Sequence, residues 1–288
     1  MKSKNTPILN LKTDKQFWHK YTDFYDNLLK EIDKEEHFDL VEIGVFNSHS
    51  IKYWRNLYPN SRITGVDIKY EPTWFVDERI KYLKLDQSNV EGLQNLFYGL
   101  ENPKIIIDDG SHTPFHQLIF LHTALKVLAK KQIGENNFLI IEDIHTSLNH
   151  SLLSRKLSLR KKFKLNIKKY LIKENQPSDP YLNLCNHLNC LGLLLTVKKA
   201  KELNLPKIKI FETIHNINDI GKLEYKILDE ILNLLINTKN ISIFKRAALP
   251  DYCFKCGSQD FNSLTLECMG CKSDGYKHDD SMTVAIEI

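Results

Sequence analysis

Short apolar runs alternate with amphipathic stretches between residues 38 and 147, and this alternation predicts strands and helices in turn. Two amphipathic stretches predict helices, at 50–57 and 114–130. Strands that alternate with helices form a parallel sheet covered on both faces, so the expected fold class is α/β and doubly wound. The apolar runs predict strands at 38–43, 62–68, 81–85, 104–107 and 138–141.

The segments on either side of this region predict further elements. Apolar and aromatic side chains between 15 and 34 recur at helical spacing, which predicts one helix packed on the sheet as a cap. After residue 147 the pattern loosens. We expect helices at 191–203 and 222–235, and strands at 241–244 and 283–288 that complete a seven-stranded, mostly parallel sheet.

Length and composition allow one large domain with a small appendage. A chain of 288 residues can bury roughly three quarters of its unfolded surface. A net charge of +4 does not by itself indicate a polyanionic partner, and the absence of a signal core or membrane span favours a cytoplasmic location. The predicted regions are a helical cap at 1–37, a ligand-binding core at 38–150, a helical insertion or lid with the substrate region at 151–240, and closing strands at 241–288.

Acidic residues at the ends of the first two predicted strands indicate a nucleoside site. Glu42 and Gly44 supply a carboxylate and a tight turn, and Asp67 is placed to accept hydrogen bonds from ribose hydroxyls. Asp86 and Gln87 suit the rim of an adenine. A loop with one glycine favours a ligand with little or no phosphate. In the alternative interpretation, Glu42 and Asp67 only meet a helix N-terminus.

Two acidic motifs follow the fourth and fifth predicted strands, which should end near each other. Asp109, Glu142 and Asp143 can therefore converge as three oxygen ligands, a set that suits magnesium. His112 is then placed to remove a proton from a substrate hydroxyl. In the alternative interpretation, Asp108 caps the following helix, His112 lies on the surface and the other acids are solvated.

Four cysteines near the C-terminal end have the paired spacing of a zinc site. Two Cys-x2-Cys pairs separated by eleven residues are typical of a four-thiolate ribbon, which we place at 250–275 as an insertion between the last two strands. Two disulfides or four free thiols are the alternatives. Such a closed zinc site would be structural or serve recognition. Its ligands are Cys253, Cys256, Cys268 and Cys271.

From residue 38 to 147 the chain resembles class I S-adenosylmethionine-dependent methyltransferases, most closely the magnesium-dependent sugar O-methyltransferases of macrolide biosynthesis. The sequences Asp-Asp-Gly-Ser-His and Ile-Glu-Asp-Ile-His are specific for that group, whereas the single-glycine loop is not. Where many members have a second glycine, this chain has Asn47 and Ser48, which leaves the shape of that turn open.

The resemblance implies a Rossmann-like methyltransferase sheet that uses S-adenosylmethionine and magnesium. It also implies the role of each matching residue: Glu42, Gly44, Asp67, Asp86, Gln87 and Asp108 at the cofactor, Asp109, Glu142 and Asp143 at the metal, and His112 as general base.

Three functions fit these features. The favoured one is O-methylation of a sugar hydroxyl in a free sugar, a nucleotide-linked sugar or a glycan, with Asp109 and His112 as catalytic residues. A nucleic-acid-binding module would use the ribbon and the basic run 155–173, but it has no need for three gathered carboxylates. A hydroxylase-like relative of the same fold would need iron, which three carboxylates without a ligating histidine disfavour; entry of His112 or His145 into the coordination shell would reverse that preference.

Two expectations concern partners and the basic run. Relatives of this fold often associate, so a homo-oligomer is compatible with the sequence. The basic run can contact a phosphorylated or nucleotide-linked substrate, or can be a solvated helix face or a mobile lid.

Overall fold

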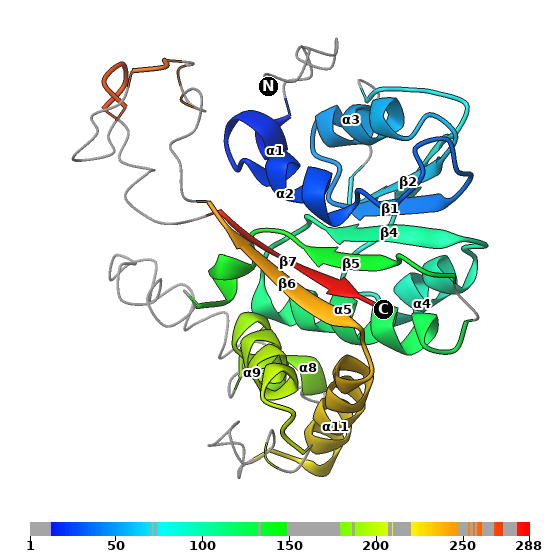
Figure 1. The fold of residues 1–288 in the computed structure, drawn as a ribbon, viewed down its shortest axis with the longest axis vertical. Coiled ribbons are helices and arrows are strands. Elements are labelled where there is room, and N and C mark those ends of the chain that lie inside the picture. The colour runs from blue at the N-terminus through cyan, green and yellow to red at the C-terminus, as the bar shows by residue number, and fades with distance from the viewer. Residues whose placement is uncertain are drawn as a thin grey trace.

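In the computed structural model, most of the chain is described, and it forms a single sheet covered by helices (Figure 1). The basic run 155–173 and most of the predicted ribbon 250–275 lie outside the described residues. The described residues are 13–148 except 70, 72–73 and 132–133, then 179–246 except 186–187, 207–208 and 210–219, and finally 253, 256, 258–260, 268–272 and 281–288.

Seven strands form one sheet in the order β3-β2-β1-β4-β5-β7-β6. Strands β1 to β5 are parallel, whereas β7 runs antiparallel to both β5 and β6. The fold class predicted from the sequence, a mostly parallel, doubly wound α/β sheet, is therefore confirmed. The strands are β1 (Asp39–Ile43), β2 (Arg62–Asp67), β3 (Ile80–Lys84), β4 (Pro103–Asp108), β5 (Phe138–Ile141), β6 (Asn240–Lys245) and β7 (Met282–Glu287).

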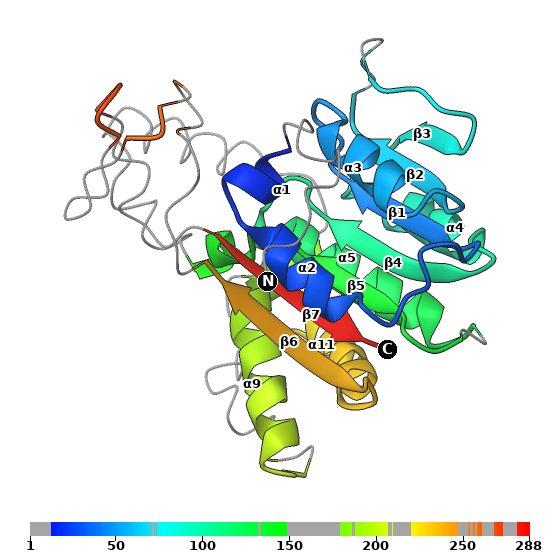
Figure 2. The same cartoon turned by 45° about the horizontal axis from the view of Figure 1, so that its top comes forward.

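Helices cover both faces of the sheet, as Figures 1 and 2 show from two directions. One face carries α1 (Asp14–Phe17), α2 (Tyr21–Leu28) and α3 (His49–Leu57). The other face carries α4 (Val90–Tyr98), α5 (Pro114–Leu128), α8 (Pro180–Cys185), α9 (Cys190–Glu202) and α11 (Lys222–Ile236). No helix in the part of the chain that the structure describes is long and apolar enough to cross a membrane.

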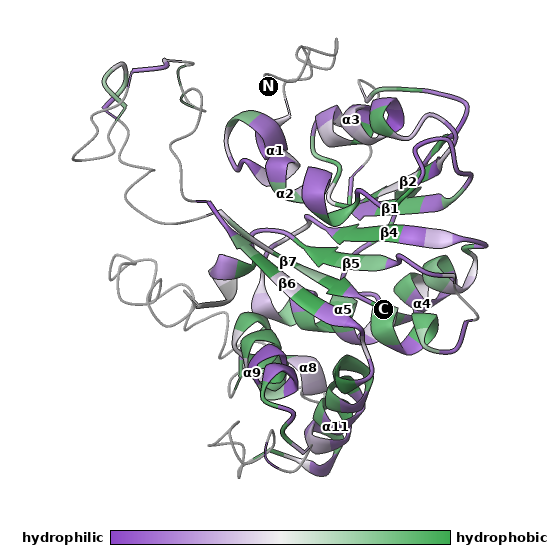
Figure 3. Cartoon of the chain, in the orientation of Figure 1, coloured by the Kyte–Doolittle hydropathy of each residue, from purple (hydrophilic) through white to green (hydrophobic). Residues whose placement is uncertain are grey.

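The core divides into two layers because successive strand residues point to opposite faces. In β1, Leu40 packs with the aromatic layer under α2 and α3, while its neighbour Val41 packs with the aliphatic layer under α5, α9 and α11. In β4, Ile105 and Ile107 lie in the first layer and Ile106 in the second. Apolar residues accordingly run through the central strands and line the inner faces of the helices (Figure 3).

The single helix predicted from 15 to 34 is wrong, because the chain forms two short helices there. The first helix ends at Phe17, and Lys20, the residue before α2, has a left-handed backbone with φ of 59° that turns the chain between the two helices. The second helix already ends at Leu28. The periodic side chains are buried as expected, for example Tyr21 and Tyr25, which have no exposed surface. The periodic pattern thus predicted which side chains are buried, but it did not predict the break between the two helices.

Candidate active site

A cavity of about 780 Å³ opens at the carboxyl ends of the parallel strands. Parallel α/β sheets bind their ligands at this edge. Of the site residues predicted from the sequence, the lining includes Gly44, Asp67, Asp86, Gln87, Asp109, His112 and Asp143. Glu42, Asp108 and Glu142 do not line the cavity; they are buried beside it, each with at most 1% of its surface exposed.

The loop after β1 is tied to the end of β2 by Asp67. One carboxylate oxygen of Asp67 accepts hydrogen bonds from the backbone N–H of Val45 at 3.0 Å and of Phe46 at 3.3 Å. Gly44 has φ of 94°, and a Cβ atom there would overlap the backbone carbonyl of Asp109. Only glycine combines this backbone angle with so close an approach. The loop can therefore lie directly against the end of β4.

The turn that lacks a second glycine is formed by ordinary residues in left-handed conformations. Phe46 has φ of 48° and Ser48 has φ of 61°, whereas Asn47 does not have a positive φ. The Ser48 side chain accepts a hydrogen bond from the backbone N–H of Phe75 at 2.8 Å. The tight turn therefore forms without a second glycine. The left-handed residues are those on either side of Asn47, and not Asn47 itself.

Glu42 is a buried support of this loop in the structure. The Trp54 indole donates a hydrogen bond to it at 2.6 Å, and the Ser50 hydroxyl donates another. Both donors lie on α3, so Glu42 fixes the start of that helix against β1. Burial raises the pKa of Glu42 to about 7. Its predicted role as a cofactor ligand stays a prediction.

Gln87 connects the third strand to the loop after β4. Its amide donates a hydrogen bond to Asp108 at 2.7 Å, and its carbonyl oxygen accepts one from the backbone N–H of Ser111 at 3.2 Å. Burial raises the pKa of Asp108 to about 6, and its second oxygen has no hydrogen-bond partner among the described residues. Asp86 accepts hydrogen bonds from the backbone N–H and hydroxyl of Ser88, which lower its pKa.

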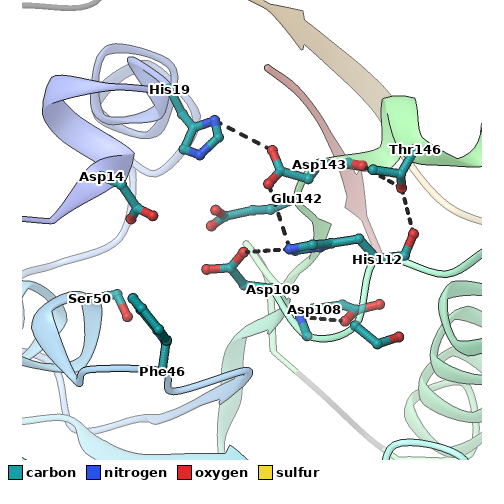
Figure 4. Close-up of polar contacts among 12 residues, drawn as sticks. Asp14, His19, Phe46, Ser50, Asp108, Asp109, His112, Glu142, Asp143 and Thr146 are labelled. Carbon is teal, nitrogen blue, oxygen red and sulfur yellow. Dashed lines mark hydrogen bonds and ion pairs between the residues drawn. The ribbon is translucent and has the colours of Figure 1, made fainter. Parts of the chain in front are cut away.

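Asp109, His112 and Asp143 converge on one point at the cavity wall, as Figure 4 shows. The Nε2 atom of His112 lies 4.0 Å from Asp109 Oδ1 and 3.7 Å from Asp143 Oδ2. Ligand atoms around a small cation lie on the order of 3–4 Å apart, so this set can hold a metal ion. The first acid comes from the end of β4 and the second from the end of β5.

Two of these three residues have a backbone that ordinary side chains rarely adopt. His112 has φ of 55° and Asp143 has φ of 48°. The Thr146 hydroxyl, in the 3-10 turn 144–148, donates hydrogen bonds to the backbone carbonyls of both, at 2.6 and 2.9 Å. Strain of this kind is concentrated at functional sites. The turn after β5 therefore holds both side chains toward the cavity.

Glu142 points away from His112 and meets a lysine that the sequence had not indicated. The ammonium of Lys15 lies 2.7 Å from both carboxylate oxygens of Glu142, and 2.6 Å from Asp109 Oδ2. A third carboxylate, Glu42, lies 3.8 Å from the same nitrogen. Burial alone would lower the pKa of Lys15, but these acids outweigh burial and raise it well above its usual value. Lys15 is therefore a buried cation among acids.

Hydroxyl groups from α2 complete the polar contacts of the two β5 acids. The Tyr25 hydroxyl donates a hydrogen bond to Glu142 at 2.5 Å, and the Tyr21 hydroxyl donates one to Asp143 at 2.6 Å. Even so, burial and the nearby Asp109 raise the pKa of Asp143 to about 8 and that of Glu142 well above its usual value. The negative charge of the centre is therefore only partly compensated.

Helix α2 and the segment just before it supply the functional residues that the sequence analysis missed. Lys15, in the short α1, carried no signal because its partners are 94 and 127 residues away. His19 lies 3.5 Å from Asp143 and was not indicated either. Tyr21 and Tyr25 were predicted to be buried, but nothing in their spacing indicated hydroxyl groups directed at carboxylates.

The four cysteines come together at a second, separate place. The Sγ atoms of Cys253 and Cys271 lie 3.7 Å apart, and those of Cys256 and Cys268 lie 3.5 Å apart. These separations exceed the roughly 2.05 Å of a disulfide and match the roughly 3.8 Å between thiolates around tetrahedral zinc. All four thiols lie within 4.8 Å of one another. Trp18, which follows α1, packs against the two buried cysteines.

The sheet, with the cavity and the acidic residues at its carboxyl edge, defines a doubly wound α/β protein of the Rossmann-like fold class. No protein-family model matches the chain. The 8-demethyl-8-(2-methoxy-alpha-L-rhamnosyl)-tetracenomycin-C 3'-O-methyltransferase of Streptomyces olivaceus is 30% identical over 138 residues, which are 45% of this chain and 33% of that protein. The mycinamicin VI 2''-O-methyltransferase of Micromonospora griseorubida is 28% identical over 139 residues, 46% of this chain and 33% of that protein.

These matches confirm the resemblance to sugar O-methyltransferases over less than half of the chain. The matched region spans about a third of the length of either relative. Among solved structures, the MycE methyltransferase of the mycinamycin biosynthetic pathway, in complex with Mg and SAH, has a TM-score of 0.48 at 22% identity, and the match covers 68% of this chain and 47% of that one.

Proposed function

We propose that the chain is an S-adenosylmethionine-dependent O-methyltransferase that uses a divalent cation, magnesium, to methylate a sugar hydroxyl. One observation carries the proposal: Asp109, His112 and Asp143 converge on the wall of the same cavity that the Gly44 loop and Asp67 line. A methyl donor and an acceptor can thus meet beside a base and a cation site. The sugar as acceptor is supported by the two relatives, whose names are those of O-methyltransferases that act on glycosylated compounds.

The donor half of the cavity suits a nucleoside with little phosphate. Asp67 accepts a hydrogen bond from the loop that Gly44 begins and lines the cavity, which supports the proposal that its carboxylate accepts hydrogen bonds from ribose hydroxyls. Gln87 and Asp86 line the cavity further along the sheet edge, where the adenine would lie. Two buried acids support this half of the cavity. Asp108 accepts a hydrogen bond from Gln87, and Glu42 accepts one from Trp54 of α3.

The donor set of the acidic centre fits a magnesium ion. Asp109 and Asp143 each present a carboxylate oxygen to a common point, and Glu142, the third predicted ligand, is directly adjacent in sequence. Hard oxygen ligands of this kind are those that magnesium prefers. Burial, and after it the negative charge of Asp109, raise the pKa of Asp143. When bound, the ion would neutralise that charge and polarise the acceptor oxygen.

In the proposed reaction, His112 acts as general base. The acceptor oxygen forms a bond to the methyl carbon of the donor while the carbon–sulfur bond breaks and its electron pair stays on sulfur. His112 Nε2 takes the hydroxyl proton, and the products are the methyl ether and S-adenosylhomocysteine. Asp109 and Asp143 keep the imidazole directed at the cavity, since its Nε2 lies within 4.0 Å of both carboxylates. Orientation of the two reactants supplies much of the acceleration.

Calorimetric titration of S-adenosylhomocysteine into the full chain tests the donor site directly. We expect a dissociation constant on the order of micromolar for the wild type, and at least a tenfold loss in Asp67→Asn, which is a loss of about 1.4 kcal/mol. Asp26→Asn, on the exposed side of α2, is the matched control and should bind as the wild type does. Binding that is absent in the wild type, or equal in both variants, would contradict the proposal.

Methyl transfer itself is tested with a panel of free, nucleotide-linked and polyketide-linked sugars, with S-adenosylmethionine and magnesium present. We expect transfer to a hydroxyl of at least one sugar and no transfer to the matching deoxy compound. Transfer that is unaffected by Asp109→Asn would contradict the cation role of this centre.

The cysteine cluster is proposed as a structural zinc site. Its four thiols are spaced for tetrahedral coordination and leave no open position for a reactant. The site lies in the connection between β6 and β7, away from the cavity lining. Zinc here would fix the fold of that connection.

A further inference from the structure

We propose that Lys15 is a built-in cation of the acidic centre, which a divalent cation must displace before Glu142 can become its ligand. The inference rests on the cation site of the proposed function, but not on methyl transfer. It makes Lys15 a positioning residue that sets how tightly the centre binds a divalent ion.

The contacts of Lys15 are those of a cation held in a coordination shell. Its ammonium is 2.6 Å from Asp109 Oδ2 and 2.7 Å from each oxygen of Glu142, and its side chain has no exposed surface. Two of the three predicted magnesium ligands therefore already share one positive charge. An ammonium has three donors, and all three are used on these two carboxylates.

Lys15 and a divalent ion compete for the same oxygens. Magnesium binds its ligands at about 2.0–2.1 Å, so an ion on Glu142 and Asp109 would lie almost where the ammonium lies. Two cations that close repel strongly in a buried site. Binding through all three carboxylates therefore requires Lys15 to withdraw, whereas Asp109 Oδ1 and Asp143 remain available while it stays.

The element that carries Lys15 is a single helical turn. Helix α1 has four residues, and the Thr13 side chain at its start makes no capping hydrogen bond. The left-handed Lys20 separates α1 from α2, which holds Glu142 and Asp143 through its tyrosines. Asp14, next to Lys15, lines the cavity, so withdrawal of α1 would also widen the site.

Lys15 stabilises the protein when no divalent ion is bound. Removal of one partner of a buried ion pair leaves an uncompensated charge and is strongly destabilising. With Lys15 present, Glu142 and Asp109 are paired without a metal. A chain that lacks the ammonium should instead depend on a divalent ion for its stability.

The test measures Mn²⁺ binding by electron paramagnetic resonance and melting temperature, in buffer freed of divalent ions by a chelating resin and with protein-bound zinc checked by elemental analysis. Mn²⁺ prefers oxygen ligands, so it reports on the acidic centre and not on the cysteines. We expect Lys15→Met to bind Mn²⁺ at least tenfold more tightly than the wild type. Without Mn²⁺, its melting temperature should fall by about 10 °C, and Mn²⁺ should restore most of this loss.

Two variants keep the result interpretable. Lys126→Met removes a lysine that also lies 2.7 Å from a glutamate, Glu230, but far from the cavity lining, and it should match the wild type in Mn²⁺ affinity and in the response of its melting temperature. Lys15→Arg keeps the charge and should bind Mn²⁺ no more tightly than the wild type.

Three results would overturn the proposal. They are a Lys15→Met chain that binds Mn²⁺ within threefold of the wild type, one whose melting temperature does not respond to Mn²⁺, and one that fails to refold even with Mn²⁺ present while Lys15→Arg refolds. Failure of the donor titration would leave all of these measurements intact, so the two proposals fail separately.

Discussion

At the scale of single residues, the acidic centre depends on two tyrosines that lie one helical turn apart. Tyr21 and Tyr25 share one face of α2, and their hydroxyls reach Asp143 and Glu142. Both rings are fully buried. Their rings therefore pack in the core, while their hydroxyl groups donate hydrogen bonds to the acids of the site.

Loss of one hydroxyl should weaken the fold measurably. Tyr25→Phe keeps the ring but leaves Glu142 without one of its donors, so we expect the free energy of unfolding to fall by about 1–3 kcal/mol. Chemical denaturation followed by tryptophan fluorescence measures this change. Tyr98→Phe, on the exposed end of α4, is the control and should change stability by less than about 0.5 kcal/mol.

The general base is tested at the same scale. His112→Gln cannot take up the hydroxyl proton, so we expect the rate of methyl transfer to fall by about 10²–10⁴-fold. The affinity for S-adenosylhomocysteine should remain within about threefold of the wild type, since the carboxylate of Asp67 is unchanged. His37→Gln, on an exposed loop, should retain full activity, and equal rates for both variants would remove His112 from the mechanism.

The sequence predicted the acids at the strand ends but not the cation between them. Asp109 and Asp143 each follow an apolar run, and the rule that parallel strands end at one edge places them together. Lys15 follows no such rule, because nothing in its neighbours indicates burial. Its position is decided by contacts with residues 94 and 127 positions away, which local pattern does not encode.

At the scale of elements, the site is set by how closely the β1 loop approaches the end of β4. Gly44 has φ of 94° and no room for a side chain beside Asp109. All five parallel strands, with their order of succession, could be predicted because each is a short apolar run. Helix α4 was missed, although Asn89 caps it by accepting a hydrogen bond from the Gly92 N–H and its buried Leu93 and Phe97 lie at helical spacing.

A side chain at Gly44 should push the two loops apart. We expect Gly44→Ala to lower the affinity for S-adenosylhomocysteine by at least tenfold in calorimetric titration, because alanine disfavours this φ and its Cβ would overlap Asp109. Gly134→Ala is the matched control, since a Cβ there would make only ordinary contact with Lys104. If the two variants bound equally well, the close approach would have no part in donor binding.

At the scale of the whole molecule, two polar centres contact the same short N-terminal segment. Lys15 of α1 enters the acidic centre, and Trp18, three residues later, packs against Cys253 and Cys268. The Arg246 guanidinium after β6 also donates a hydrogen bond to the Trp18 carbonyl at 2.7 Å. This segment therefore links the acidic centre at the carboxyl edge of the sheet to the β6–β7 connection.

Zinc content is the measurement that belongs to this scale. We expect elemental analysis to find one zinc per chain in the wild type and none in Cys268→Ser, which removes one of the four proposed ligands. The melting temperature of that variant should fall as well. Cys185→Ser replaces a free cysteine outside the cluster and should keep its zinc. Zinc retained in Cys268→Ser would contradict the four-thiolate site.

The distance along the chain between Lys15 and its carboxylates also fixes an order of assembly. Contacts that close long loops form late, because the chain loses the entropy of loop closure before it gains the favourable energy of the contact. Strands β4 and β5 carry the acids that Lys15 contacts, so we expect these strands to pair, and the acids to meet and repel, before α1 docks. Docking of α1 then cancels that repulsion. In refolding, the arrival of a segment that precedes every strand in the sequence should therefore follow the pairing of β4 with β5.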